Sequence, residues 1–197
     1  MPRPRSESAR QAVLAAMRSA VVGEGYEALT IEGLAAEAGV SKQTIYRWWP
    51  TKAAILGEAL VEGALPQAIP DPPTAEQPAA DQPAPDLATE LVNWLTGSAQ
   101  QLGRAEGLGV ARALIAVTAS DPEVGAALNE RLAAPVREWV QQRVELATAR
   151  GEVREGVDAI LLADHLIAFT AYAALTGAPQ TESRIRATVT LLLTGIT

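Results

Sequence analysis

The chain has 197 residues and is 48% hydrophobic, which is enough apolar material for a folded core and excludes disorder throughout. It has no Cys and a single His, His165, which excludes disulfides, cysteine nucleophiles and metal sites built from thiolates or clustered imidazoles. The net charge of −7 argues against nucleic-acid binding by the chain as a whole. The charge is uneven, however, because residues 1–60 hold seven of the 16 basic and only six of the 23 acidic residues. This segment therefore carries a charge of +1 and the remainder a charge of −8.

From this composition we expect no catalytic residues, no metal and no cofactor. We find no uninterrupted apolar run near the 18 residues that a membrane span needs, and the first ten residues lack the apolar stretch of a signal peptide. We therefore expect a cytoplasmic protein without membrane contact. Strand patterns are nearly absent and good helix formers dominate, which predicts an all-α fold of about nine helices.

The first 65 residues predict a group of short helices. Thr30, Ser41 and Thr51 are the expected N-caps of the second, third and fourth helices, because their side-chain oxygens can accept hydrogen bonds from exposed amides. Gly39 is expected to stop the second helix in the left-handed conformation. We expect these helices over residues 8–22, 31–38, 42–49 and 52–60.

A proline-rich stretch divides the chain. Residues 66–85 hold seven of the thirteen prolines, a density that no helix survives, so they predict a linker between a domain at 1–65 and a domain at 86–197. Asp86 and the pair Asp121-Pro122 are expected to start helices beyond it. Gly103, Gly107 and Gly109 are expected to loosen the chain before a short helix. The expected helices of the second domain cover residues 86–102, 111–117, 122–150, 158–176 and 180–195.

Residues 30–52 form the most specific pattern in the chain. A short helix, a turn that contains glycine and a second short helix are typical of a helix-turn-helix, whose second helix lies in the major groove of DNA. Helical periodicity assigns an inward face to Leu34, Ala35, Ala38, Val40, Ile45 and Trp49. The outward side chains can bond base edges, contact thymine methyl groups and reach phosphates, and they comprise Lys42, Gln43, Thr44, Tyr46, Arg47 and Trp48.

This segment resembles the tetracycline-repressor (TetR) family of bacterial regulators. The shared residues are Gly25, Tyr26, Thr30, Leu34, Ala35, Ala38, Gly39, Val40, Ser41, Thr44, Tyr46, Trp49 and Lys52, with Leu34 in place of Ile and Trp49 in place of Phe. The resemblance implies that Gln43, Thr44 and Arg47 lie nearest the bases. It implies backbone contacts for Thr30, Ser41, Lys42, Tyr46, Trp48 and Lys52. Arg3 and Arg5 are either a minor-groove arm or a frayed terminus.

The resemblance extends to the second domain and implies effector binding and dimerisation there. The candidates for contact with a small hydrophobic effector, which are otherwise ordinary core residues, are Trp94, Arg112, Trp139, His165, Phe169 and Tyr172. The last two helices carry much apolar surface, which is either ordinary core or, as the resemblance implies, a four-helix bundle in a homodimer. The expected interface residues are Leu161, Leu166, Ile185, Val189, Leu192 and Ile196.

Three functional hypotheses follow from these patterns. The first is a repressor that binds double-stranded, palindromic operator DNA and is released by a small-molecule effector. The second is an enzyme or carrier whose helical domain acts on a small molecule, although no nucleophile and base stand at a suitable spacing. The third is a regulator without a ligand, whose second domain serves only for dimerisation.

Overall fold

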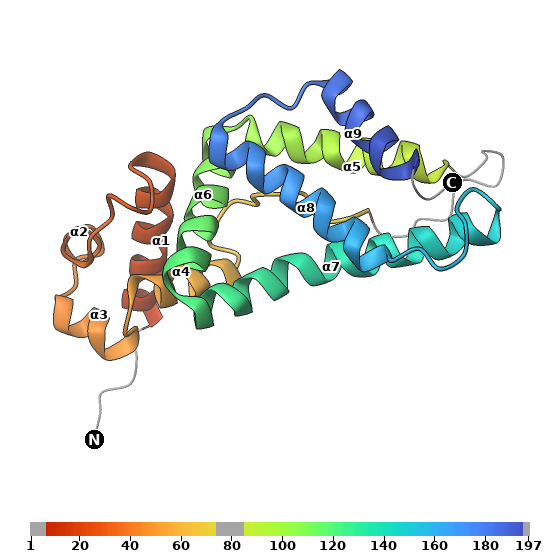
Figure 1. The fold of residues 1–197 in the computed structure, drawn as a ribbon. Coiled ribbons are helices and arrows are strands. Elements are labelled where there is room, and N and C mark those ends of the chain that lie inside the picture. The colour runs from red at the N-terminus through yellow and green to blue at the C-terminus, as the bar shows by residue number, and fades with distance from the viewer. Residues whose placement is uncertain (1–6, 74–84, 195–197) are drawn as a thin grey trace. The chain divides into compact units, whose positions relative to one another are not determined.

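The computed structural model describes residues 7–73 and 85–194 of the chain. Within these ranges it contains nine helices and no strand (Figure 1), which confirms the expected all-α fold. Their bounds in chain order are α1 (Glu7–Gly23), α2 (Ile31–Glu37), α3 (Lys42–Trp48), α4 (Lys52–Val61), α5 (Leu87–Leu102), α6 (Ala105–Ser120), α7 (Pro122–Ala149), α8 (Ala159–Thr176) and α9 (Glu182–Thr194).

Contacts between residues divide the described chain into two units. The first unit combines the described residues up to Ala68 with Arg104–Asn129, so it contains α1 to α4, α6 and the start of α7. The second unit combines the remaining described residues and contains α5, the rest of α7, α8 and α9. The division at residues 66–85 stays a prediction, and residues 74–84 of the expected linker lie outside the described ranges.

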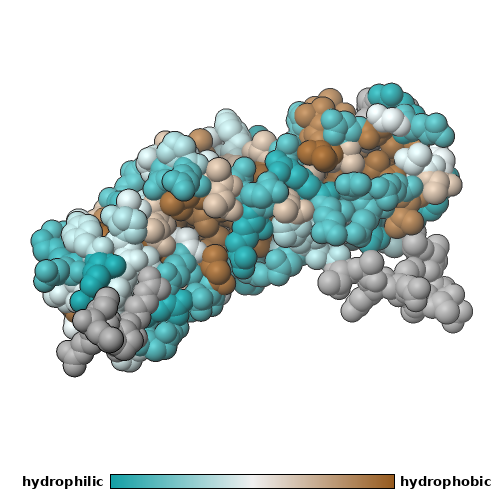
Figure 2. Space-filling view, turned by 90° about the horizontal axis from the view of Figure 1, so that it is seen from below, coloured by the Kyte–Doolittle hydropathy of each residue, from teal (hydrophilic) through white to brown (hydrophobic). Residues whose placement is uncertain are grey.

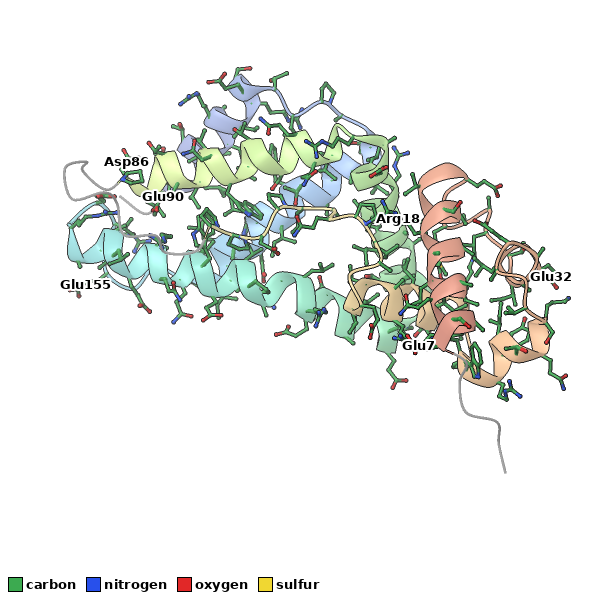
Figure 3. The ribbon with its side chains drawn as sticks, turned by 180° about the vertical axis from the view of Figure 1, so that it is seen from behind. Glu7, Arg18, Glu32, Asp86, Glu90 and Glu155 are labelled. Atoms are coloured by element: carbon green, nitrogen blue, oxygen red, sulfur yellow. The ribbon has the colours of Figure 1, made fainter. Side chains whose placement is uncertain are left out.

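Side-chain caps begin α2, α3, α4 and α5, as the sequence predicts. The hydroxyls of Thr30, Ser41 and Thr51 each accept a hydrogen bond of 3.1 Å from a backbone amide three residues further on. Asp86, at the N-terminal end of α5 in Figure 3, accepts one of 2.8 Å from the amide of Thr89. Hydrogen bonds from the Thr89 side chain and backbone hold the pKa of Asp86 below its ordinary value. Each cap satisfies an amide that the helix itself leaves without a partner.

The core of the first unit is built from one apolar face of each short helix. α1 contributes residues at helical spacing that are fully buried, and α4 contributes two adjacent positions. Side chains without measurable exposure include Val13, Leu14, Met17, Ile45, Ile55 and Leu56. Leu34 of α2 is also buried, so every helix of the expected helix-turn-helix is anchored to the same core.

Gly103 lies between α5 and α6, but the expectation for Gly107 and Gly109 was wrong. Gly107 and Gly109 do not loosen the chain but lie inside α6, which runs from Ala105 to Ser120. A Cβ atom on Gly109 would lie 2.8 Å from the carbonyl oxygen of Val21 in α1. The glycine therefore allows two helix backbones to approach each other closely, and packing outweighs its low helix propensity.

A second close approach joins α6 to the start of α7. A Cβ atom on Gly125 would lie 2.5 Å from the Cα atom of Thr118, well inside any normal contact. Asp121 caps α7 by accepting a hydrogen bond of 3.2 Å from the amide of Val124, as expected from the Asp-Pro pair. α6 is thus packed against α1 near one end and against α7 near the other.

The second unit has its own apolar core. Buried residues of α5, α7, α8 and α9 form it, among them Leu91, Leu95, Val140, Leu166 and Ile185. Ion pairs at its edge join Arg137 to Asp164 at 2.8 Å and Arg143 to Glu90 at 3.2 Å. By length and composition alone, α8 passes for a membrane-spanning helix, a test that core helices of soluble proteins also pass.

Replacing Gly125 by Ala should destabilise the first unit by about 1–3 kcal/mol, because the added methyl group meets backbone that cannot turn away. Gly57→Ala is the matched control, since a Cβ atom on Gly57 would lie 3.7 Å from Val124, an ordinary contact. Alanine is the better helix former by about 1 kcal/mol at both sites. Urea denaturation followed by circular dichroism should show a lower free energy of unfolding for Gly125→Ala than for Gly57→Ala. Equal free energies would contradict the close packing of Gly125 against Thr118.

Candidate nucleic-acid interface

The turn between α2 and α3 is tight and depends on one glycine. Gly39 has a φ of 66°, in the left-handed region, and directly follows the C-cap residue Ala38. The amide of Val40 donates a hydrogen bond of 3.0 Å to the carbonyl oxygen of Ala35, which closes the end of α2. Ser41 then caps α3, so the chain changes direction within three residues.

One side of α3 is buried and the other is exposed. Ile45 is fully buried and Trp49, the residue that ends α3, is 2% exposed. The predicted inward residues Leu34 and Ala35 are buried as well, and Ala38 and Val40 are half-buried. The opposite face of α3 is thereby turned outward.

The outward face carries the chemistry that base and phosphate recognition needs. Gln43, Tyr46 and Arg47 are exposed, Tyr46 to 56%, and Trp48 is half-buried. The guanidinium carbon of Arg47 lies 5.9 Å from the centroid of the Trp48 ring. The hydroxyl of Thr44, also half-buried, forms a hydrogen bond of 2.9 Å with the hydroxyl of Ser41. Amide, guanidinium and hydroxyl groups are thus presented together along one short helix.

Lys42, at the start of α3, forms an ion pair with Glu32 of α2. The hydrogen bond between them raises the pKa of Lys42 and lowers the pKa of Glu32. Both side chains are exposed, and Figure 3 labels Glu32 on α2, so the pair contributes little to stability. A phosphate oxygen could therefore replace Glu32 at small energetic cost.

Lys52, by contrast, is turned toward the protein. Its Nζ atom donates to the carbonyl oxygens of Tyr26 and Leu29, at 3.0 and 3.3 Å, and lies 4.5 Å from the centroid of the Tyr26 ring. Tyr26 is buried, and this burial raises its pKa to about 12. Lys52 thus ties α4 to the loop that precedes Thr30, a role that the sequence pattern did not reveal.

Two further residues that the pattern did not reveal lie behind α3. The indole N–H of Trp49 donates a hydrogen bond of 2.7 Å to Oε2 of Glu58 in α4. Oε1 of the same carboxylate accepts a hydrogen bond of 2.5 Å from Arg10 in α1. Arg10 and Glu58 stand 48 positions apart, so no local spacing in the sequence could have paired them.

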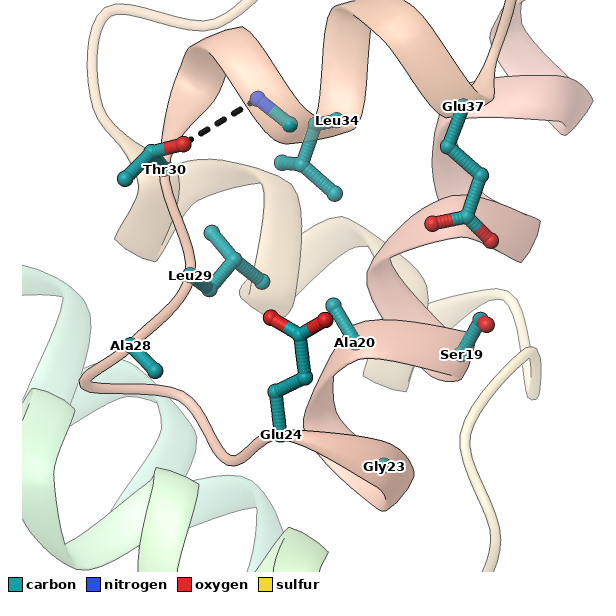
Figure 4. Close-up of a pocket in the computed structure, with 10 residues that line it drawn as sticks. Ser19, Ala20, Gly23, Glu24, Ala28, Leu29, Thr30, Leu34 and Glu37 are labelled. Carbon is teal, nitrogen blue, oxygen red and sulfur yellow. Dashed lines mark hydrogen bonds between the residues drawn. The ribbon is translucent and has the colours of Figure 1, made fainter.

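A hollow of about 280 Å³ lies beside Thr30, between α1 and α2. Figure 4 shows the carboxylates of Glu24 and Glu37 directed toward it from two sides, and the dashed hydrogen bond from Gly33 to Thr30 at its edge. Two carboxylates repel phosphate, so the hollow is unsuited to the DNA backbone. Within residues 7–73 and 85–194 no group of three potential metal ligands comes together.

The six residues expected to bind an effector occupy different places. Trp94 and Trp139 are buried in the core of the second unit, with ring centroids 6.0 Å apart, and Phe169 packs against the same core. His165 and Tyr172 lie on the exposed side of α8, where Nδ1 of His165 is 2.7 Å from the carbonyl oxygen of Leu161. Arg112 is exposed on α6, in the first unit.

The expected dimer residues divide in a similar way. Leu161 is 54% exposed, whereas Leu166, Ile185 and Val189 are buried in the core of their own chain. Leu192 is half-buried, and Ile196 lies outside the described residues. The large apolar side chains that α8 and α9 do expose are Ile160, Leu161, Tyr172, Leu175 and Leu191. Apart from Leu161, the sequence pattern had assigned none of them to the interface.

Two family models match the chain. Residues 13–59 match the model described as bacterial regulatory proteins, tetR family. Residues 82–192, more than half of the chain, match the model described as tetracyclin repressor-like, C-terminal domain. The first match contains the whole of α2, α3 and the turn between them, and the second contains most of the second unit.

Relatives and solved structures agree with these matches. The HTH-type transcriptional regulator YdeS of Bacillus subtilis is 30% identical over 156 residues, which cover 79% of this chain and 73% of that protein. GusR of Salmonella enterica is 18% identical, with a TM-score of 0.64 and coverage of 96% and 97% of the two chains. NalD of Pseudomonas aeruginosa is 16% identical, with a TM-score of 0.64 and coverage of 98% of each chain.

These likenesses cover both halves of the chain. The two structures, at such low identity, establish a common fold, and the family models and YdeS establish the kinship. The family consists of DNA-binding transcriptional regulators rather than enzymes. This chain belongs to the TetR family of bacterial transcriptional regulators.

Proposed function

We propose that this protein is a cytoplasmic repressor that binds a palindromic operator as a homodimer and is released by a small hydrophobic effector. The observation that carries the proposal is the exposed face of α3, where Gln43, Tyr46 and Arg47 project from a helix whose other face is buried. NalD is described as the secondary repressor of a multidrug efflux pump. That description supports repression as the direction of control.

In the proposed complex α3 lies in the major groove. Gln43, Thr44 and Arg47 read base edges, and Thr30, Ser41, Lys42, Tyr46 and Trp48 contact the sugar-phosphate backbone. Because its ammonium group is engaged with Tyr26 and Leu29, Lys52 acts by holding the loop before Thr30 rather than by reaching out to a phosphate.

Arg47→Ala should weaken binding to a duplex selected by the wild-type protein from random DNA by about 1–3 kcal/mol, since a bidentate contact to a base is lost. Arg131→Ala, which removes an exposed positive charge from α7, is the matched control and should bind as wild type does. Fluorescence anisotropy at fixed salt measures both affinities. If the two variants bind equally well, Arg47 does not read the operator.

Dimerisation is proposed through the outward face of α8 together with α9. Residues at alternating spacings of four and three along α8 form this face: Leu161, His165, Ala168, Tyr172 and Leu175. All five are exposed, Leu175 to 62%. Figure 2 shows apolar residues reaching the surface in patches among hydrophilic ones. A second copy would cover this face and form a four-helix bundle, which would set two α3 helices about 34–36 Å apart or a multiple of that distance.

The double variant L161E/L175E should be monomeric, because pairing would bring four carboxylates into an apolar contact. It should also lose binding to a duplex with two half-sites, since one protomer contacts only one of them. Leu146→Glu is the control, because Leu146 is 50% exposed in the same unit but belongs to α7 and not to the proposed face. Sedimentation velocity measures the state of association. A dimeric double variant would refute the proposed interface.

The effector is proposed to bind within the second unit, among apolar and aromatic side chains such as Trp94, Trp139 and Phe169. An effector can release DNA only to the extent that it prefers the state that does not bind the operator. By linkage, binding of the operator must disfavour the effector by the same factor. This reciprocity gives the proposal a quantitative test.

A hydrophobic compound that weakens operator binding by a given factor should itself bind more weakly, by that same factor, when the protein is saturated with the duplex. Titration calorimetry with and without DNA measures the two affinities. Native mass spectrometry identifies candidate compounds that remain bound to the purified protein. If the purified protein carries no compound, and no member of a broad panel of hydrophobic compounds releases the operator, the protein is a regulator without a ligand. Turnover of a bound compound would instead indicate an enzyme.

A further inference from the structure

The C-terminal end of α3 is held by a polar link as well as by apolar packing. Trp49 ends the helix, and its backbone N–H donates a hydrogen bond of 2.8 Å to the carbonyl oxygen of Ile45. Its ring is almost completely buried, yet the indole N–H is polar and needs an acceptor there. Glu58 supplies this acceptor at 2.7 Å.

Glu58 is itself held from the other side. Its side chain is 21% exposed, and that of its partner Arg10 is 12% exposed. Arg10 also pairs with Glu62 and Glu7, each at 2.9 Å, so three carboxylates surround one guanidinium. The hydrogen bond with Glu58 raises the pKa of Arg10 above its ordinary range, so the guanidinium stays charged. The position of Glu58, and with it the indole of Trp49, is therefore restrained by α1 and α4 together.

Contacts between side chains continue from Trp49 to the outward face. The rings of Trp48 and Trp49 meet edge to face, with centroids 5.5 Å apart and planes at 78°. The guanidinium of Arg47 lies over the ring of Trp48. Edge-to-face and cation–π contacts each have a preferred geometry, so a rotation of the Trp49 ring would be passed on to Trp48 and then to Arg47.

We propose that Trp49 and Glu58 are positioning residues for DNA recognition: they fix the ring of Trp48 and, through it, the direction in which Arg47 enters the groove. This inference rests on the proposed reading of DNA by α3. Neither Trp49 nor Glu58 touches the bases in this arrangement, so their effect falls on the discrimination between sequences. Attraction to phosphates, which gives non-specific binding, does not depend on the direction of one guanidinium.

The test is a double-mutant cycle. It measures binding to the duplex that the wild-type protein selects from random DNA and to a scrambled duplex of equal length. Trp49→Phe keeps an aromatic ring but removes the donor to Glu58 together with part of the indole. It should lower affinity for the selected duplex about tenfold, which corresponds to about 1.4 kcal/mol, and change affinity for the scrambled duplex less than about twofold. In the Arg47→Ala background the same substitution should cost almost no further affinity, because the side chain through which it acts is gone.

Ser98→Ala controls for the loss of one buried hydrogen bond elsewhere, since the Ser98 hydroxyl donates to the carbonyl oxygen of Trp94 in the second unit. It should leave both affinities unchanged. Thermal denaturation checks that each variant is folded. Should Trp49→Phe fail to fold, Glu58→Gln takes its place in the cycle, because it keeps the shape of the side chain but no longer offers Trp49 and Arg10 a carboxylate to share.

The outcomes separate this inference from the proposed function. A wild-type protein that binds selected and scrambled duplexes equally well would overturn both. Two other outcomes, in a wild-type protein that does prefer the selected duplex, would overturn the positioning role alone. One is that Trp49→Phe loses the same affinity for both duplexes. The other is that it loses as much affinity in the Arg47→Ala background as in the wild type.

Discussion

The outward face of α3 depends on the burial of the opposite side of the same helix. Ile45 and Trp49 fill the core of the first unit, and a helix with 3.6 residues per turn that buries those two positions must turn Gln43, Tyr46 and Arg47 outward. A seven-residue helix is too short to be stable alone. Its shape and its orientation therefore both come from this packing, and a change in the core behind α3 is a change in what the protein presents to DNA.

Close contact between helix backbones determines which helices belong to that core. Gly109 meets the carbonyl of Val21, and Gly125 meets the backbone of Thr118, so α6 and the start of α7 pack with α1 to α4. Side chains at these positions would hold the helices apart. The unit that carries α3 therefore contains residues from well beyond the proline-rich stretch.

Basic and acidic groups of the first unit serve two different purposes. Lys42 and Arg47 are exposed and suited to DNA, whereas Arg10 and Lys52 are engaged within the protein, with Glu58 and with backbone carbonyls. A charge that is partly removed from water needs partners, and here those partners join elements distant in the chain. The positive charge of residues 1–60 is therefore only partly available to a ligand outside the protein.

The sequence by itself determined the all-α class, the caps at Thr30, Ser41, Thr51 and Asp86, and the inward and outward faces of α3, because caps and periodicity are local properties of the chain. Only the tertiary structure decided that Gly109 lies inside a helix and that Leu166, Ile185 and Val189 are buried in their own chain while Tyr172 and Leu175 are exposed. It alone decided that Glu58 joins Arg10 to Trp49. These features depend on which helices touch. The periodicity of apolar residues in a sequence is the same whether those residues are covered by their own chain or by a second chain.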